Sequence, residues 1–474
     1  MKFFLFRLQN ICSNKAQGIM PIQSINPKNG TPIKEYPELH INEINALLDK
    51  SWQAFEGWKR LQLKDRTECF RSLAMILRTN ALEYGELMAN EMGKPIDQGI
   101  QEVEKCAWCC EYYVQNAPLM LKDEFVSTEA QSSFITYQPL GVIFAIMPWN
   151  FPFWQVFRAA VPALMAGNAM VLKHSSLVPG CALKIERIFQ EAGFPEGLFR
   201  SLLIENDKAS AVLSNKNVRA VTFTGSTEAG AIVASNAGMQ LKKIVLELGG
   251  SDPYLILEDA DIAKAARLCA KARMLNSGQS CIAAKRFIVI NSVKKNFENF
   301  FVEEMRAYTP GNPLEEGTQL GPLASTKLRD QLHKQVQGSI HKGAKLLLGG
   351  TLPEGNGAYY PATILTDVTK GMPAFDEELF GPVAAVISAK DEAQAIRMAN
   401  DTSFGLGAAV FTKDIERGRR IARDELEAGS CFVNDFVKSD PRLPFGGIKR
   451  SGYGRELSSF GIHEFVNIKT VVVK

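Results

Sequence analysis

The sequence predicts an α/β protein made of two doubly wound domains and a small β extension. Three observations carry this prediction. A chain of 474 residues is longer than one hydrophobic core supports, at ~150 residues per domain. Short apolar strands alternate with helical segments in two successive runs, which is typical of parallel sheets with right-handed crossovers. The chain then ends in a β-rich tail that is too short to form a core.

The first run opens with helices and continues with strands. Apolar residues recur at helical spacing from Asn42 to Ala117, so this section is expected to be helical. Apolar strands then alternate with helices, which predicts a parallel sheet that binds ligands at the carboxyl ends of its strands. These strands are expected at residues 141–147, 169–173, 198–204, 218–223 and 243–248.

A second alternation predicts the second domain. It begins with an apolar strand at residues 254–258, continues with a helix up to Met274 and a strand at Arg286–Ile290, and ends near Val433. The chain finishes with the β-rich segment HEFVNIKTVVVK. Because an unpaired edge strand promotes association, this tail is expected to pair with another subunit or with residues 134–138.

Composition and charge argue against several classes of protein. With 54 Lys and Arg against 51 Asp and Glu, the net charge is +3, and no basic run suits a nucleic-acid backbone. No segment approaches the ~20 apolar residues of a membrane helix. The 9 cysteines are odd in number and scattered, as reduced thiols are, so a cytoplasmic protein is expected. Residues 1–19 are expected to be a disordered or misassigned extension, with Met20 as the real start.

Cys281 is the candidate nucleophile. It lies in NSGQSCIAAKR, where small and flexible residues let a substrate approach the sulfur closely. The alternative for any cysteine is a buried small hydrophobic residue, which is the expected role of the other eight. The CAWCC run at Cys106–Cys110 suggests a metal or redox pair, but its helical pattern favours packing.

Glu247 and Asn150 are candidate partners of this cysteine. Glu247 ends an apolar strand in VLELGG, where burial would raise its pKa and suit it to accept a proton. The alternative is a capped or solvated acid. Asn150 lies in PWNFP between two prolines that restrict the backbone, so its amide is a fixed donor for an oxyanion. The alternative is that it caps the following helix.

A phosphate-binding turn is expected in VTFTGSTEAG. A strand runs directly into Gly225, Ser226 and a helix, which points backbone N–H groups at a phosphate. This turn alone is weak evidence, since many strand–Gly–helix junctions bind no nucleotide.

Taken together, these segments resemble the aldehyde dehydrogenase superfamily. PWNFP, FTGSTEAG, LELGG, NSGQSC, EELFGP and PFGGIKRSGYGRE occur in that family's order, and the resemblance covers Pro21 to the C-terminus. The segments PWNFPFWQVFR, LKHSS and LELGGSDP are most similar to bacterial succinate-semialdehyde dehydrogenases. The resemblance implies an aldehyde dehydrogenase-like fold. It assigns residues 20–120 and 139–246 to a dinucleotide-binding domain, 247–433 to a catalytic domain, and 121–138 and 455–474 to an oligomerisation extension.

The resemblance also implies roles for single residues. Cys281 is the nucleophile, Glu247 the general base and Asn150 the oxyanion donor. NAD or NADP is the expected cofactor, and no metal is required, since the 5 histidines show no ligand spacing. The cofactor-binding positions are Trp149, Lys173, Ser176, Phe223, Gly225, Ser226, Gly230, Glu378 and Phe380.

The residue at position 176 bears on the choice of cofactor. Many NAD-preferring relatives carry an acid there, and Ser176 leaves a 2'-phosphate without charge repulsion, so NADP is expected as well as NAD.

Arg158 matches an arginine that clamps the distal carboxylate of succinate semialdehyde. Trp154 lies one helical turn before it, so the two share a helix face. A second arginine of some of those enzymes is Leu275 here, so Ser439 or Arg442 would help. The alternative is that Arg158 pairs with an acid elsewhere. The substrate-binding positions are Arg158, Trp154, Ser439 and Phe445.

The expected function is therefore NAD(P)-dependent oxidation of succinate semialdehyde to succinate through a cysteine thioester, in a homodimer or homotetramer. Alternatives are a dehydrogenase for another short aliphatic or ω-carboxy aldehyde, a cofactor-free thiol hydrolase, and a catalytically silent binding or structural protein of the same fold. The lack of a candidate triad histidine disfavours the hydrolase.

Overall fold

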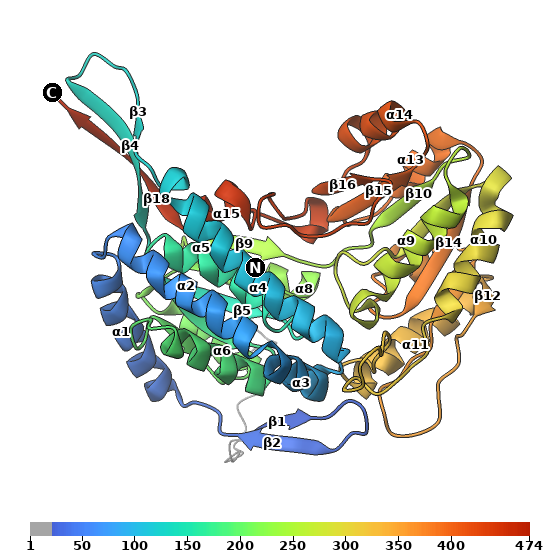
Figure 1. Ribbon diagram of the computed structural model, residues 1–474, viewed down its shortest axis with the longest axis horizontal. Coiled ribbons are helices and arrows are strands. Elements are labelled where there is room, and N and C mark those ends of the chain that lie inside the picture. Colours follow the sequence, from blue (N-terminus) through green and yellow to red (C-terminus); the bar gives the residue numbers. More distant parts are fainter. Residues whose placement is uncertain (1–20) are drawn as a thin grey trace, which may run out of the picture.

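The computed structural model describes residues 21–474. The prediction for residues 1–19, and Cys12 with it, lies outside the described residues. Two sheet-and-helix bodies and a projecting β arm make up this part of the chain (Figure 1). No helix of residues 21–474 is long and apolar enough to cross a membrane.

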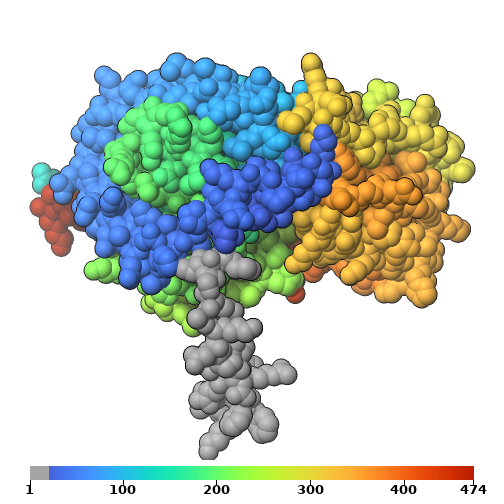
Figure 2. Space-filling model, turned by 90° about the horizontal axis from the view of Figure 1, so that it is seen from below, coloured from blue at the N-terminus to red at the C-terminus, as the bar shows by residue number. Residues whose placement is uncertain are grey.

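The helical opening section contains four helices, and a β-hairpin that the sequence did not predict precedes them. The hairpin crosses from the first body to the second (Figure 2), where Ala358 N donates to Pro27 O at 2.8 Å. The elements are β1 (Ile22–Ile25), β2 (Pro32–Tyr36), α1 (Ile41–Trp58), α2 (Leu63–Thr79), α3 (Ala81–Met92) and α4 (Ile96–Met120).

The first body holds a sheet with the strand order β17-β9-β8-β5-β6-β7. Its strands are parallel except for β17, which comes from near the C-terminus and pairs antiparallel with β9. The strands are β5 (Val142–Met147), β6 (Ala169–His174), β7 (Phe199–Ser201), β8 (Val218–Thr224), β9 (Lys243–Glu247) and β17 (Gly452–Tyr453). The helices are α5 (Trp154–Met165), α6 (Pro179–Glu191), α7 (Ala209–Ser214) and α8 (Thr227–Met239).

The central strands of this sheet are buried and rich in aliphatic residues, as both faces of a parallel sheet require. Four of the five predicted strands agree with the structure to within a residue at each end, but the strand expected at 198–204 shortens to β7. Because β5, β8 and β9 are neighbours, their carboxyl ends meet at one edge. This edge brings together Asn150, Gly225 and Glu247.

The second body holds the strand order β12-β13-β14-β11-β10-β15-β16, parallel except for the edge strand β12. Its strands are β10 (Pro253–Ile256), β11 (Arg286–Ile290), β12 (Lys345–Leu348), β13 (Thr363–Thr366), β14 (Val383–Ala389), β15 (Gly407–Phe411) and β16 (Ser430–Val433). Its helices are α9 (Ile262–Met274), α10 (Asn291–Arg306), α11 (Thr326–His341), α12 (Pro373–Asp376), α13 (Glu392–Asn400) and α14 (Ile415–Arg420).

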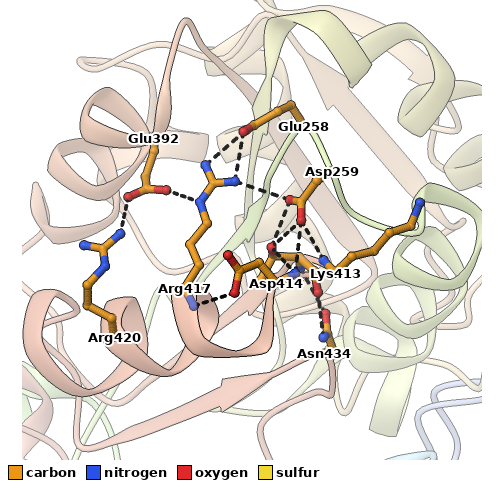
Figure 3. A network of polar contacts seen from close by, with 9 residues as sticks. Glu258, Asp259, Glu392, Lys413, Asp414, Arg417, Arg420 and Asn434 are labelled. Carbon is orange, nitrogen blue, oxygen red and sulfur yellow. Dashed lines mark hydrogen bonds and ion pairs between the residues drawn. The ribbon is translucent and has the colours of Figure 1, made fainter.

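An ion-pair network closes the carboxyl edge of this second sheet (Figure 3). Arg417 of α14 binds Glu392 of α13 and donates to Glu258 at 2.9 Å. Asp259 accepts from the backbone N–H of Lys413 at 2.9 Å. These groups are partly exposed, so each pair adds little stability alone and the network mainly fixes the loop after β10.

The C-terminal tail pairs with residues of its own chain. β18 (Val466–Val473) runs antiparallel to β4 (Ser132–Pro139), with Phe134 opposite Val471, and β3 (Glu124–Phe125) completes the sheet. A short helix, α15 (Ser458–Glu464), leads into β18. The prediction that the tail pairs with residues 134–138 is confirmed. The three strands project from the body as an arm (Figure 1).

Candidate active site

The loop that carries Cys281 has an unusual backbone that fixes its course. It follows the short helix η2 (Leu275–Gly278), in which Asn276 and Ser277 have φ of 55° and 54°. Lys285 is fully buried and donates to the carbonyl oxygens of Ser280 at 3.0 Å and Cys281 at 2.7 Å. These two hydrogen bonds fix the backbone of the loop that carries Cys281. Left-handed backbone at non-glycine residues costs energy and concentrates at functional sites.

Cys281 lies where two cavities meet. It lines a cleft of about 680 Å³ between the bodies and also a cavity of about 70 Å³ on its other side. Of the predicted residues, the cleft is lined by Trp149, Asn150, Gly225, Ser226, Glu378 and Phe380. The small cavity is lined by Trp154, Arg158, Ser439 and Phe445.

The Cys281 thiol is protonated at rest. Burial raises its pKa to about 12, although the positive charges of Arg158 and Lys285 act in the opposite direction. The sulfur therefore needs a base to take its proton as attack begins.

Asn150 is held as an amide donor and does not cap the helix. Its side-chain Nδ2 donates to Gln279 O at 3.1 Å, and its backbone carbonyl oxygen accepts from Asn276 Nδ2 at 2.6 Å. The start of α5 is capped instead by Glu102, whose Oε1 accepts from Phe153 N at 2.9 Å and Trp154 N at 2.8 Å. Since an amide carries two N–H groups, one remains for an oxyanion.

Glu247 is a buried acid without hydrogen bonds to its carboxylate in the described part of the chain. It is 2% exposed, which rules out the solvated alternative, and burial raises its pKa well above the usual value. Its Oε1 points toward Gly446, where an added Cβ would lie 2.8 Å from that oxygen. Neither cavity is lined by Glu247. Its side chain must therefore rotate before it reaches water beside the thiol.

The cleft has the features of a nucleotide site at the start of α8. Ser226 caps this helix, accepting from Ala229 N at 3.3 Å, and the first turn opens into the cleft. Gly230 allows close packing, because an added Cβ would lie 2.4 Å from the Leu248 side chain. On the opposite wall, Glu378 accepts from Gly250 N at 3.1 Å.

Four predicted cofactor positions do not line the cleft: Lys173, Ser176, Phe223 and Gly230. Lys173 is the penultimate residue of β6 and is 4% exposed, and burial lowers its pKa. Ser176 is half-buried in the turn that follows β6. Phe223 packs beneath Gly225. Lys173 and Ser176 thus lie at the same edge of the sheet as the cleft but are not among the residues that line it.

Two positions were expected for Arg158, one beside the substrate and one in an ion pair with an acid. In the structure Arg158 lines the small cavity and also pairs with an acid. Its Nε binds Glu456 Oε2 in a pair whose side chains are 2% and 3% exposed, and its guanidinium lies 4.6 Å from the Phe445 ring centre. Arg442 pairs with Asp440 at 2.6 Å and does not line the cavity.

Four further residues of the site were not predicted from the sequence: Lys105, Glu456, Lys285 and Gln155. Gln155 lines both cavities, and Lys105 of α4 lines the small one. Gln155 follows Trp154 in the recognised PWNFPFWQVFR segment, so that motif could have suggested it. No spacing rule marks Lys105, because its helical pattern shows only which face of α4 is buried.

Comparison with known proteins decides the family. A model described as the aldehyde dehydrogenase family matches residues 14–471. The chain belongs to this family. The recognition made from the sequence motifs is therefore confirmed.

Known relatives of this aldehyde dehydrogenase are similar to it in sequence over nearly the whole chain. A probable succinate-semialdehyde dehydrogenase (NADP+) of Synechocystis is 49% identical over 452 residues, 95% of this chain and 99% of that one. The Escherichia coli succinate semialdehyde dehydrogenase Sad, named for NAD(P)+, is 46% identical, over 94% of this chain and 97% of its own.

The fold expected for an aldehyde dehydrogenase is confirmed as well. The crystal structure of a Streptococcus pyogenes succinic semialdehyde dehydrogenase with NADP+ has a TM-score of 0.93 and 34% identity, covering 95% of this chain and 99% of that one.

Proposed function

We propose that this aldehyde dehydrogenase oxidises succinate semialdehyde to succinate, with NADP or NAD as hydride acceptor. The observation that carries the proposal is the small cavity beside Cys281, which joins an apolar wall to cationic and hydroxyl groups. Such a cavity suits an aldehyde with a carboxylate at its far end. The names of the Synechocystis and E. coli relatives support the same substrate.

The proposed reaction uses three side chains of the chain. The thiol of Cys281 gives its proton to solvent as the sulfur forms a bond to the aldehyde carbon, and Asn150 Nδ2 with the Cys281 N–H stabilises the resulting oxyanion. The nicotinamide, when bound in the cleft, supplies the acceptor for the hydride that leaves this carbon. Glu247 then takes a proton from water, which attacks the thioester and releases the acid with the thiol.

A substrate panel tests this function. Succinate semialdehyde, a longer ω-carboxy aldehyde and butanal are compared by the absorbance of the reduced cofactor with NAD and with NADP. We expect kcat/KM to be at least about tenfold higher for succinate semialdehyde than for butanal, as one charge-assisted contact provides. If none of the aldehydes supports reduction of the cofactor, then the dehydrogenase function is rejected. If butanal is preferred, then succinate semialdehyde is rejected as the substrate.

Ser176→Glu is expected to shift cofactor choice toward NAD. The added carboxylate would repel a 2'-phosphate, so KM for NADP should rise ~10- to 100-fold while KM for NAD changes little. The measurement is KM for both cofactors at saturating aldehyde. Ser176→Gln, similar in size but neutral, is the matched control. If it shifts the ratio equally, then bulk and not charge is responsible.

We also infer that the enzyme works as a homodimer or homotetramer in the cytoplasm. The sheet order β18-β4-β3 leaves one edge of β18 without a partner strand in the described chain, and Ile468 and Val472 on it are 60% and 53% exposed. A reducing compartment keeps the thiol of Cys281 available for attack.

A further inference from the structure

Lys105 reaches the substrate cavity from α4, a helix that contains none of the family motifs. It lies on α4, and its Nζ donates to Ser439 Oγ at 2.7 Å and stands 4.4 Å from the Trp154 ring centre. Both of these neighbours line the cavity, and Cys281 lines it too. The ammonium is therefore fixed within the same small space as the nucleophile.

Lys105 differs from the other cations of this cavity in having no carboxylate partner. Arg158 is paired with Glu456, and Lys438 is paired with Asp435 at 2.7 Å. Within residues 21–474, Lys105 forms no ion pair, and its Nζ is bonded to a neutral hydroxyl. Among the three cations that line the cavity, Lys105 is thus the one without a carboxylate at ion-pair distance in the described residues.

Burial of the Lys105 ammonium is energetically unfavourable as long as no anion lies beside it. Burial, helped by the nearby charge of Arg158, lowers the pKa of Lys105 to about 8. A half-buried ammonium without a counter-ion is stabilised strongly when a carboxylate arrives, because the anion replaces lost hydration.

We propose that Lys105 determines specificity by binding the distal carboxylate of an ω-carboxy aldehyde, with Ser439 as a second donor. Ser439 Oγ accepts from Lys105, so its own O–H is free to donate. The charge of Arg158 is balanced by that of Glu456, so Arg158 can offer the substrate carboxylate one N–H hydrogen bond but no net positive charge. This assignment deepens the proposed function and rests on it.

The test compares Lys105→Met and Lys105→Arg with wild type on succinate semialdehyde and butanal. Lys105→Met keeps the length of the side chain and removes its charge. We expect KM for succinate semialdehyde to rise ~10- to 100-fold, the size of one charged hydrogen bond, with a change below about threefold for butanal. Lys105→Arg should recover most of the loss, which a purely structural role would not predict.

Lys184→Met is the matched control. It removes a partly buried lysine that stands 6.0 Å from the Tyr84 ring centre, as Lys105 stands beside Trp154, but that lines neither cavity. Both aldehydes should therefore react as in wild type. Equal losses on both substrates for Lys105→Met, or an equal loss in Lys184→Met, would overturn the assignment. The proposed function fails separately, if wild type itself shows no preference for the carboxylate substrate.

A pH profile gives a readout that packing alone would not change. The ratio of kcat/KM for succinate semialdehyde to that for butanal should fall as pH rises through about 8, because Lys105 loses its proton there. Titration of the thiol cancels in this ratio. In Lys105→Met this ratio should not change with pH. If it still falls with rising pH in that variant, then Lys105 does not bind the carboxylate. The charged or titratable groups facing Lys105 are Arg158 of α5, Glu102, Cys106 and Cys109 of α4, and Asp440 of the loop after β16.

Arg158→Ala is not a clean test of carboxylate binding. Removing this guanidinium would leave Glu456 as an unpaired buried carboxylate. The negative charge of Glu456 already acts to raise the pKa of Glu247. The variant would therefore change the base as well as the cavity, and Lys105 is the residue that separates the two effects.

Discussion

Cys281→Ser is expected to lower kcat/KM by ~10⁴-fold or more while cofactor binding stays intact. A hydroxyl is a far weaker nucleophile than a thiol, and within residues 21–474 no histidine lines either cavity to activate it. The loop should keep its course, since the bonds from Lys285 reach backbone oxygens and not the sulfur. Stopped-flow detection of reduced cofactor measures the loss, and fluorescence titration measures cofactor affinity.

Cys69→Ser is the matched control, because Cys69 is half-buried on α2 and lines neither cavity. It should retain wild-type activity. A Cys281→Ser enzyme that keeps a tenth of the activity would remove Cys281 from the role of nucleophile.

Alkylation provides a second measure of the same residue. With a pKa of about 12 for the free enzyme, the thiolate fraction grows ~tenfold per pH unit over the whole working range. The rate of inactivation by iodoacetamide should therefore rise with pH without a plateau. A plateau near neutral pH would show that the resting sulfur is already ionised.

The strands, and the place of Cys281 beside the cleft, could be predicted because their signals are local. Apolar runs of the right length mark β5, β6 and β8, and the segment around Cys281 is short and specific. In the first sheet the cleft lies at the carboxyl ends of the strands, where the general rule for such sheets expects a ligand. In the second sheet, Cys281 and Glu378 precede β11 and β14, so this sheet contributes from its amino ends. The sequence offers no sign of that reversal.

The substrate cavity could be predicted only in part, because it depends on contacts between distant segments. Lys105 and Ser439 are 334 positions apart and meet only after α4 packs beside the loop that follows β16. The pairing of Arg158 with Glu456 likewise joins α5 to the segment before α15. A motif identifies Arg158 as a cation, but only the fold shows that its charge is already neutralised.

Glu247→Gln is expected to lower steady-state kcat by ~10²- to 10⁴-fold, since water attack on the thioester loses its base. Because burial raises the pKa of Glu247, wild-type activity should fall as pH drops through that raised pKa, when the carboxylate becomes protonated. This fall of activity at low pH should be absent in Glu247→Gln. If the variant still shows it, then the titrating group is not Glu247. A burst of about one reduced cofactor per active site should remain, as sulfur attack and hydride loss precede the water step.

Hydroxylamine separates this role from a general loss of structure. It is a stronger nucleophile than water and attacks a thioester without help from a base. Turnover of Glu247→Gln should therefore recover when hydroxylamine is added, and the hydroxamate should accumulate in step with reduced cofactor. Cys281→Ser should not recover, because it forms no thioester to intercept. If hydroxylamine leaves Glu247→Gln inactive, then Glu247 acts before the thioester, in removing the thiol proton that burial holds so firmly on Cys281.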